Sequence, residues 1–184
     1  ARKGITTAAI AVNIFFISGV SDYFNDYLDA TVTEGTGKRY GEIAALLYAA
    51  KKRNPRYKYV FDSAAKLCEV LEHKYELGLK TRLAYENGDK KALKKLANED
   101  YVIVKKKLHA FRNAFEKQWF HENKPHGFDV QDLRLGGIIL RTETCRKRIL
   151  DYVKHRGGTR ITMTAGIRAV RDARERYEII RRVS

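Results

Sequence analysis

Apolar residues recur at intervals of three and four positions through most of this chain. That spacing places side chains on one face of an α-helix, whereas a half-buried strand would alternate at every second position. The two clearest series are Val60, Ala64, Leu67, Leu71 and Tyr75, and Tyr101, Val104, Leu108, Phe111 and Phe115. The pattern predicts an all-α fold, a bundle of about five to seven helices with long central helices.

Turn and capping residues set the expected boundaries of these helices. Helices are expected over about residues 42–53, 57–86, 129–154 and 165–182, with two more after the N-caps Asp89 and Asn98. The expected stops are Asn54-Pro55, Asn87-Gly88 and Gly157-Gly158, and the glycine-containing stretch 31–41 is expected to be a flexible connection. The chain therefore reads as a single helical domain over residues 1–184, with an irregular lead-in (1–40), a helical core (41–155) and a basic C-terminal segment (156–184).

The segment from Trp119 to Gly137 carries the densest group of special residues in the chain. It combines an aromatic anchor, a Pro-Gly loop, two acids, an arginine and a glycine pair, namely Trp119, Asn123, Lys124, Pro125, Gly127, Asp129, Asp132, Arg134, Gly136 and Gly137. We expect a structural corner in which Trp119 is a packing anchor and Asp129 caps the following helix. Arg134 is expected to be buried and tied to Asp129 or Asp132.

The helix after this corner is expected to turn Val130, Leu133, Gly137, Leu140 and Ile149 inward. A glycine in such a stripe permits close approach of a neighbouring helix, so the glycine pair is the expected contact point. Acid–base catalysis by the two aspartates is the alternative, because paired carboxylates serve that chemistry. Capping and the helix dipole explain first-turn aspartates without catalysis.

The chain has a formal net charge of +15, from 37 Lys and Arg against 22 Asp and Glu. That excess attracts phosphate backbones and anionic surfaces, although lysines on the polar faces of helices also give a plain solvated surface. The candidates for anion binding are Arg168, Arg171, Arg174, Arg181 and Arg182. One interpretation of the chain is therefore a stand-alone basic helical protein that binds nucleic acid or scaffolds an assembly.

The sequence offers little for metal, cofactor or membrane binding. The histidines are scattered, and His121 and His126 have no third ligand at metal-site spacing. No nucleophile elbow, Walker loop or dinucleotide fingerprint occurs, so no cofactor is expected. Cys68 and Cys145 fall in helical apolar patterns, which suggests buried thiols and a reducing, cytoplasmic location. The apolar run over residues 5–20 is too short and too polar for a membrane span.

The corner resembles the C-terminal helical domain of a bacterial branch of glycoside hydrolase family 20, the β-N-acetylhexosaminidases. The resemblance is carried by Trp119, the Asn-Lys-Pro of residues 123–125, Gly127, Asp129 and the Asp-Leu-Arg-Leu-Gly-Gly of residues 132–137. Weaker similarities at residues 25–29, 77–85 and 88–90 extend it over about residues 20–155.

This resemblance implies an all-α module packed beside a catalytic (β/α)8 barrel of the same enzyme. The family removes terminal β-linked N-acetylhexosamine by a retaining mechanism, in which an Asp-Glu pair of the barrel assists the substrate's own acetamido oxygen. This chain contains no Asp-Glu dipeptide and no alternation of strands and helices, and a barrel needs about 200 residues or more. No catalytic residues are therefore expected here, and the expected partners are the barrel and, through it, the β-N-acetylhexosaminide. The basic segment departs from the acidic, Glu-rich continuation of that family.

Overall fold

A computed structural model describes residues 32–154, and all structural statements below concern this range. Its elements are α2 (Thr36–Arg53), the 3-10 helix η2 (Pro55–Tyr57), α3 (Lys58–Lys74), α4 (Leu77–Glu86), α5 (Lys90–Asn98), α6 (Asp100–Glu122) and α7 (Phe128–Lys154). Residues 32–154 contain no strand, so the predicted all-α fold is confirmed. None of these helices combines the length and the apolar character needed to cross a bilayer. The helix expected over residues 165–182 lies outside the described residues.

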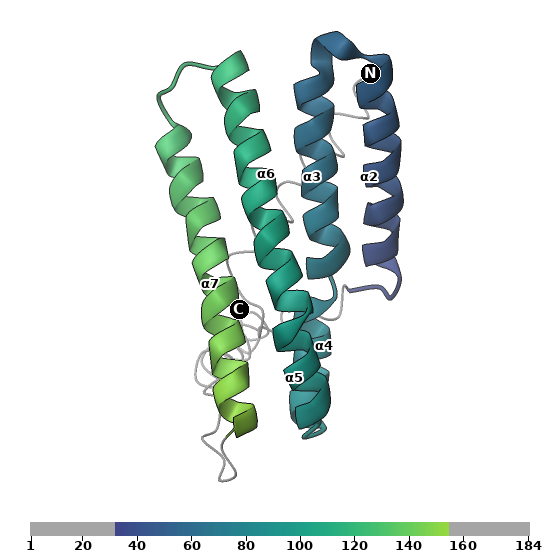
Figure 1. The fold of residues 1–184 in the computed structure, drawn as a ribbon, viewed down its shortest axis with the longest axis vertical. Helices are drawn as coiled ribbons and strands as arrows, with labels where there is room; N and C mark the ends of the chain where they lie inside the picture. The colour runs from purple at the N-terminus through teal and green to yellow at the C-terminus, as the bar shows by residue number, and fades with distance from the viewer. Residues whose placement is uncertain (1–31, 155–184) are drawn as a thin grey trace, which may run out of the picture.

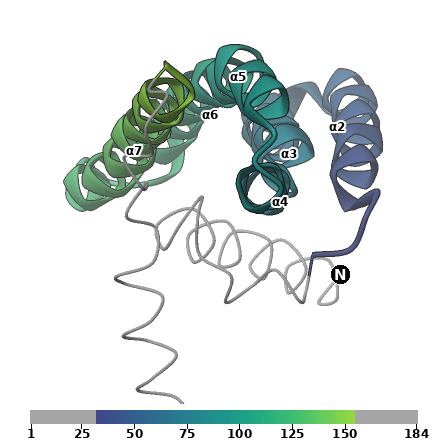
Figure 2. The same ribbon diagram turned by 90° about the horizontal axis from the view of Figure 1, so that it is seen from below.

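The four long helices α2, α3, α6 and α7 lie side by side in one row, and the chain reverses direction from each to the next (Figure 1). Each packs chiefly on its neighbour in the row, and α7 also packs on α5. Seen from one end, the row follows a curve (Figure 2). The short helices α4 and α5 connect α3 to α6. They lie beside the C-terminal end of α3 and the N-terminal end of α6. The helices α2 and α7 are therefore the two edges of an open layer.

Side chains from α3 to α7 share one hydrophobic core. Its fully buried members include Val70, Leu71, Leu77, Leu93, Tyr101, Val104, Leu108, Leu135, Ile138 and Ile149. The hydroxyl of Tyr101 lies 3.1 Å from Oγ1 of Thr81, which also donates to the carbonyl of Leu77. These contacts satisfy buried polar groups and join α4 to α6.

Several local signals predicted the helix ends correctly. Helix α2 ends at Arg53, where Asn54 donates its side-chain amide to the carbonyl of Ala50. Helix α4 ends before Asn87, and Gly88 has a φ of 66°. Asp89 caps α5, because its carboxylate accepts the backbone N–H of Ala92 at 2.8 Å. The expected cap at Asn98 is wrong, since Asn98 is the last residue of α5.

The prediction of a single helix over residues 57–86 is wrong, because Tyr75 and Glu76 separate α3 from α4. The Glu76 carboxylate accepts the backbone N–H groups of Gly35 at 3.0 Å and Gly37 at 3.4 Å, and it pairs with Lys80 at 3.0 Å. Burial opposes ionisation of Glu76, but Lys80 and these two N–H groups outweigh it and lower its pKa. The break therefore supplies a carboxylate to the N-terminus of α2, where negative charge is favoured.

The flexible connection expected over residues 31–41 is also corrected, because α2 begins at Thr36. Gly37 and Gly41 lie one helical turn apart on the side of α2 that meets α3. A Cβ added to Gly37 would lie 2.6 Å from the carbonyl oxygen of Glu72. Gly37 therefore allows α2 to lie close to the backbone of α3, and Gly41 leaves room for the side chain of Glu72, so both glycines are part of a helix contact.

The inward face expected for α7 is largely wrong. Ile149 is buried, but Val130, Leu133 and Leu140 are 42%, 77% and 70% exposed, and Gly137 is exposed as well. The buried side of α7 consists of Phe128, Leu135, Ile138, Ile139, Thr142, Cys145 and Ile149. The predicted and the observed inward residues both have helical spacing. The helix is apolar on two opposite sides over residues 130–140, so the spacing alone does not show which side is buried.

Candidate functional site: the corner between α6 and α7

Four aromatic side chains fill the angle between the end of α6 and the start of α7. Trp119 lies with its ring centroid 6.0 Å from Phe115 and 5.9 Å from Phe128. The ring centroid of Phe120 lies 5.2 Å from that of Phe128. Phe128 is only 4% exposed, so the first residue of α7 is held by rings from α6. Trp119, the predicted packing anchor, contacts one ring of each helix.

The turn itself is fixed by backbone geometry and one side-chain hydrogen bond. Helix α6 ends where Asn123 becomes extended, and its N–H still donates to the carbonyl of Trp119 at 2.7 Å. The indole Nε1 of Trp119 donates to the carbonyl of Lys124 at 3.1 Å. Gly127 has a φ of 95°, a conformation that side chains rarely adopt, and an added Cβ would lie 3.5 Å from the indole ring. The loop therefore folds back over Trp119.

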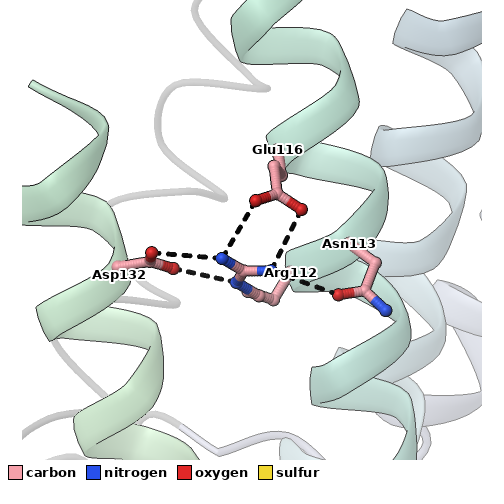
Figure 3. Close-up of polar contacts among 4 residues, drawn as sticks. All are labelled: Arg112, Asn113, Glu116 and Asp132. Carbon is pink, nitrogen blue, oxygen red and sulfur yellow. Dashed lines mark hydrogen bonds and ion pairs between the residues drawn. The ribbon is translucent and has the colours of Figure 1, made fainter. Parts of the chain in front are cut away.

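An arginine that the sequence analysis did not select ties the two helices together below the turn (Figure 3). Arg112 on α6 donates Nε to one oxygen of Asp132 on α7 at 2.8 Å and Nη2 to the other at 3.1 Å. The same guanidinium donates to both oxygens of Glu116, at 3.0 and 3.1 Å. The hydrogen bonding of Arg112 to the Asp132 carboxylate, which accepts from the guanidinium, is the main reason that the pKa of Arg112 is raised. Arg112 also lies over the ring of Phe128 at 5.7 Å.

Two roles predicted for corner residues are corrected by this network. Asp132 pairs with Arg112, and the expected burial of Arg134 is wrong because its side chain is exposed. Asp129 is not the N-cap, because α7 has already begun at Phe128. It lies in the first turn of the helix, where its negative charge interacts favourably with the helix dipole. The spacing of four positions between Arg112 and Glu116 is typical of an ion pair within one helix, so this contact could be read from the sequence. The contact of Arg112 with Asp132 on α7 depends on how the two helices pack.

The glycine pair after Asp132 does not make the predicted close contact within this chain. A Cβ built on Gly136 or on Gly137 would meet no heavy atom within 4 Å. Both residues lie in the middle of α7, on or beside its exposed side. Nothing in the packing of residues 32–154 requires glycine at these two positions.

Other candidate groups are dispersed over the described part of the chain. No three of its His, Cys, Asp and Glu side chains are placed to hold a metal ion. The ring of His121 packs on Tyr59 of α3 at 4.3 Å, which joins the corner to the start of α3. The predicted anion-binding arginines, Arg168, Arg171, Arg174, Arg181 and Arg182, lie outside the described residues.

One buried charge stands apart from the corner. Lys74, the last residue of α3, has 6% of its surface exposed. Burial disfavours the ammonium form and lowers the pKa of Lys74 to about 8. Both cysteines are free thiols, and burial also raises the pKa of Cys68 to about 11, which makes it a poor nucleophile at neutral pH.

Residues 21–162 match the family described as the Glycoside Hydrolase 20C C-terminal domain. The chain belongs to this family. The match contains every helix from α2 to α7 and agrees with the range of about residues 20–155 over which the resemblance was recognised. No curated protein matches the chain. In this glycoside hydrolase 20C C-terminal domain, the corner is a contact between two helices built from aromatic packing, a fixed turn and an ion pair.

Proposed function

We propose that this chain is a non-catalytic accessory domain of a glycoside hydrolase that removes terminal β-linked N-acetylhexosamine. The observation that carries the proposal is that residues of the corner form a turn and hold two helices together. Gly127 forms the turn, Trp119 closes it, and Asp132 is engaged by Arg112. The family match supports the same conclusion, since it describes a C-terminal domain of such enzymes.

The chemistry then belongs to a catalytic barrel of the same polypeptide. Substrate-assisted cleavage needs a carboxylate pair at adjacent positions, and this chain has no Asp-Glu dipeptide. The role of the helical domain is to pack against the barrel and fix its position, in an enzyme of carbohydrate metabolism. The free thiols of Cys68 and Cys145 support a reducing, cytoplasmic setting for it.

The reading frame that contains these residues provides the first test. We expect it to encode a barrel with an Asp-Glu pair, and the purified full polypeptide should release nitrophenol from a nitrophenyl β-N-acetylglucosaminide. A variant of that Asp-Glu pair should lose this activity and keep its helical domain folded. A reading frame without a barrel would contradict the proposal.

Nucleic-acid binding is the second candidate, and the net charge of +15 favours it. Binding of labelled oligonucleotide to the chain at about 50 and 200 mM salt tests this function, because affinity from phosphate contacts falls steeply with salt over that range. Salt-sensitive binding by a chain whose gene lacks a barrel would favour the second function over the first. Absence of binding at both salt concentrations would remove it.

A further inference from the structure

The turn that joins α2 to α3, residues 51–58, is called here the basic turn. It has five Lys or Arg among eight residues and no acid, namely Lys51, Lys52, Arg53, Arg56 and Lys58. All of these except Lys51 are exposed. Short runs of this composition are typical of surfaces that bind acidic polymers, such as heparin-like glycans and nucleic acids.

The positive charge of the basic turn is not neutralised within the domain. Lys51 pairs with Asp62 of α3 at 2.6 Å. No acid within residues 32–154 forms an ion pair with the other four cations, Lys52, Arg53, Arg56 and Lys58. By contrast, Lys105 and Arg112 on α6 are both paired with acids of α7. The basic turn therefore presents uncompensated charge to solvent.

Helix geometry accounts for only half of this charge. Lys52 and Arg53 lie in the last turn of α2, where the helix dipole favours cations. Arg56 and Lys58 lie where α3 begins, and positive charge is unfavourable there. The first turn of α3 contains no acid, and its N-cap Tyr57 makes no capping hydrogen bond through its side chain. Arg56 and Lys58 therefore destabilise the domain by itself, and bound anionic groups would offset this cost.

The aromatic residue of the basic turn favours a glycan over a nucleic acid. Tyr57 is 49% exposed, and the guanidinium of Arg56 lies 5.5 Å from its ring centroid. An exposed ring beside a cation suits an acidic sugar, because the C–H groups of the sugar pack on the ring while its carboxylate meets the cation. Single-stranded nucleic acids are bound on series of aromatic rings, and the basic turn has one.

We propose that the basic turn binds the acidic part of a glycan from which the catalytic domain removes the terminal β-linked N-acetylhexosamine. The inference rests on the proposed function and names its class of substrate, a glycan that carries carboxylates. Arg56 and Lys58 pair with carboxylates of the glycan, and Tyr57 packs on one of its sugar rings. The helical domain thereby raises the concentration of acidic substrates beside the barrel without taking part in the chemistry.

The kinetics of the full polypeptide with two oligosaccharides of equal length test the proposal. A hyaluronan oligosaccharide carries a carboxylate on every second sugar, a chitin oligosaccharide is neutral, and both are chosen to end in β-linked N-acetylglucosamine. We expect Arg56→Gln combined with Lys58→Gln to raise KM for the acidic substrate several-fold. Its kcat and both constants for the neutral substrate should stay unchanged, because the lost contacts hold acidic substrate and transition state alike.

Lys91→Gln combined with Lys94→Gln is the matched control. It removes the same charge from two exposed lysines of α5, at the other end of the row from the basic turn (Figure 1). This variant should bind and hydrolyse both substrates like the wild type. An equal rise in KM in the two double variants would overturn the proposal, because it would report net charge alone. An unchanged KM in the variant of the basic turn, or a change that is the same for both substrates, would also overturn it.

A labelled single-stranded oligonucleotide of the same charge as the hyaluronan oligosaccharide tests the other class of polyanion. Tighter binding of the oligonucleotide, lost in the variant of the basic turn, would overturn the proposal and assign this surface to nucleic acid. Turnover of the chitin oligosaccharide separates the proposal from the proposed function. An enzyme that hydrolyses it without the selective effect on KM would keep the proposed function and lose the glycan surface. A polypeptide that hydrolyses neither oligosaccharide would lose both.

Discussion

At the scale of single residues, glycines of this domain are used in two physically different ways. Gly127 has a backbone conformation that disfavours any side chain and lies against Trp119. Gly137 lies in an open stretch of regular helix, where a methyl group meets nothing. The same substitution at the two positions should therefore have opposite effects on the stability of this chain.

Gly127→Ala should lower the free energy of unfolding by about 1–2 kcal/mol, because alanine pays the cost of the left-handed conformation. Gly137→Ala should raise it by about 0.5–1 kcal/mol, since alanine gains helix propensity without a clash. Urea denaturation followed by circular dichroism measures both. Stabilisation by Gly127→Ala, or destabilisation by Gly137→Ala, would contradict the described turn and the open surroundings of Gly137.

Lys74 gives stability a dependence on pH. Its pKa is about 8 in the folded chain against 10.5 for an ordinary lysine, so the unfolded chain binds more protons between these two values. The free energy of unfolding should therefore rise with pH from about 8 to 10.5, by up to roughly 3 kcal/mol, and the full cost is present below pH 8. The comparison is the difference between wild type and Lys74→Met, in which other titrating groups cancel. A difference that stays constant from pH 7 to pH 11 would show that Lys74 is not desolvated.

Capping residues could be predicted from the sequence because they act within a few positions. Asp89 and Gly88 needed no knowledge of the tertiary fold. The partner of Asp132 could not be predicted in this way. Arg112 lies twenty positions earlier, and Arg134 was nearer in sequence but lies on an exposed part of α7. Long side chains pair with what the packing of helices brings near.

At the scale of helices, the contact between α2 and α3 depends on a short approach at one turn. A Cβ at Gly37 would lie 2.6 Å from a backbone oxygen of Glu72, which cannot move alone. A Cβ at Gly41 would lie equally close to the Glu72 carboxylate, but that exposed side chain can swing away. The two glycines thus form a matched pair in one helix.

Gly37→Ala should destabilise the chain by about 1–3 kcal/mol, because overpacking outweighs the gain of up to about 1 kcal/mol in helix propensity. Gly41→Ala should be close to neutral. Hydrogen exchange of the α2 amides should be faster in Gly37→Ala and little changed in Gly41→Ala. Equal behaviour of the two variants would argue against the close backbone contact.

The ion pair between α6 and α7 should make a modest and salt-dependent contribution. The side chains of Arg112 and Asp132 are 27% and 46% exposed, so solvent screens much of their attraction. Asp132→Asn should cost about 0.5–1 kcal/mol at low salt and less at about 1 M salt. Asp129→Asn is the control, as the neighbouring first-turn acid of the same helix. A double-mutant cycle with Arg112→Met measures the coupling, and a coupling of zero would mean that the observed bidentate contact adds nothing.

Helical periodicity predicted the buried face of α6, identified only Leu67 and Leu71 of the buried face of α3, and selected the wrong face of α7. On α6, the polar residues leave one apolar stripe, and Tyr101, Val104, Leu108 and Phe111 are indeed buried. On α7, two apolar stripes compete, and the buried one contains Thr142 and Cys145, which made it look less apolar. The break between α3 and α4 was also hidden, because it depends on a contact between Glu76 and α2.

At the scale of the whole molecule, this domain is an open row of helices whose edge helix has an uncovered apolar side. The chain belongs to a family of C-terminal domains of glycoside hydrolases, and its own corner residues serve packing and turn formation. The sequence resemblance identified this family because the corner is a compact local motif. Which side of α7 is exposed depends on the tertiary fold, and it became visible only once the helices were placed.

The central claim is that this chain has no hydrolytic activity of its own and acts as part of a larger enzyme. The most direct measurement is nitrophenol release from a nitrophenyl β-N-acetylglucosaminide, by the 184-residue chain and by the full polypeptide at equal molar concentration. We predict turnover by the full polypeptide and no release above the buffer background by the chain alone. Turnover by the chain alone would contradict the account, because it would place catalytic residues within the helical domain.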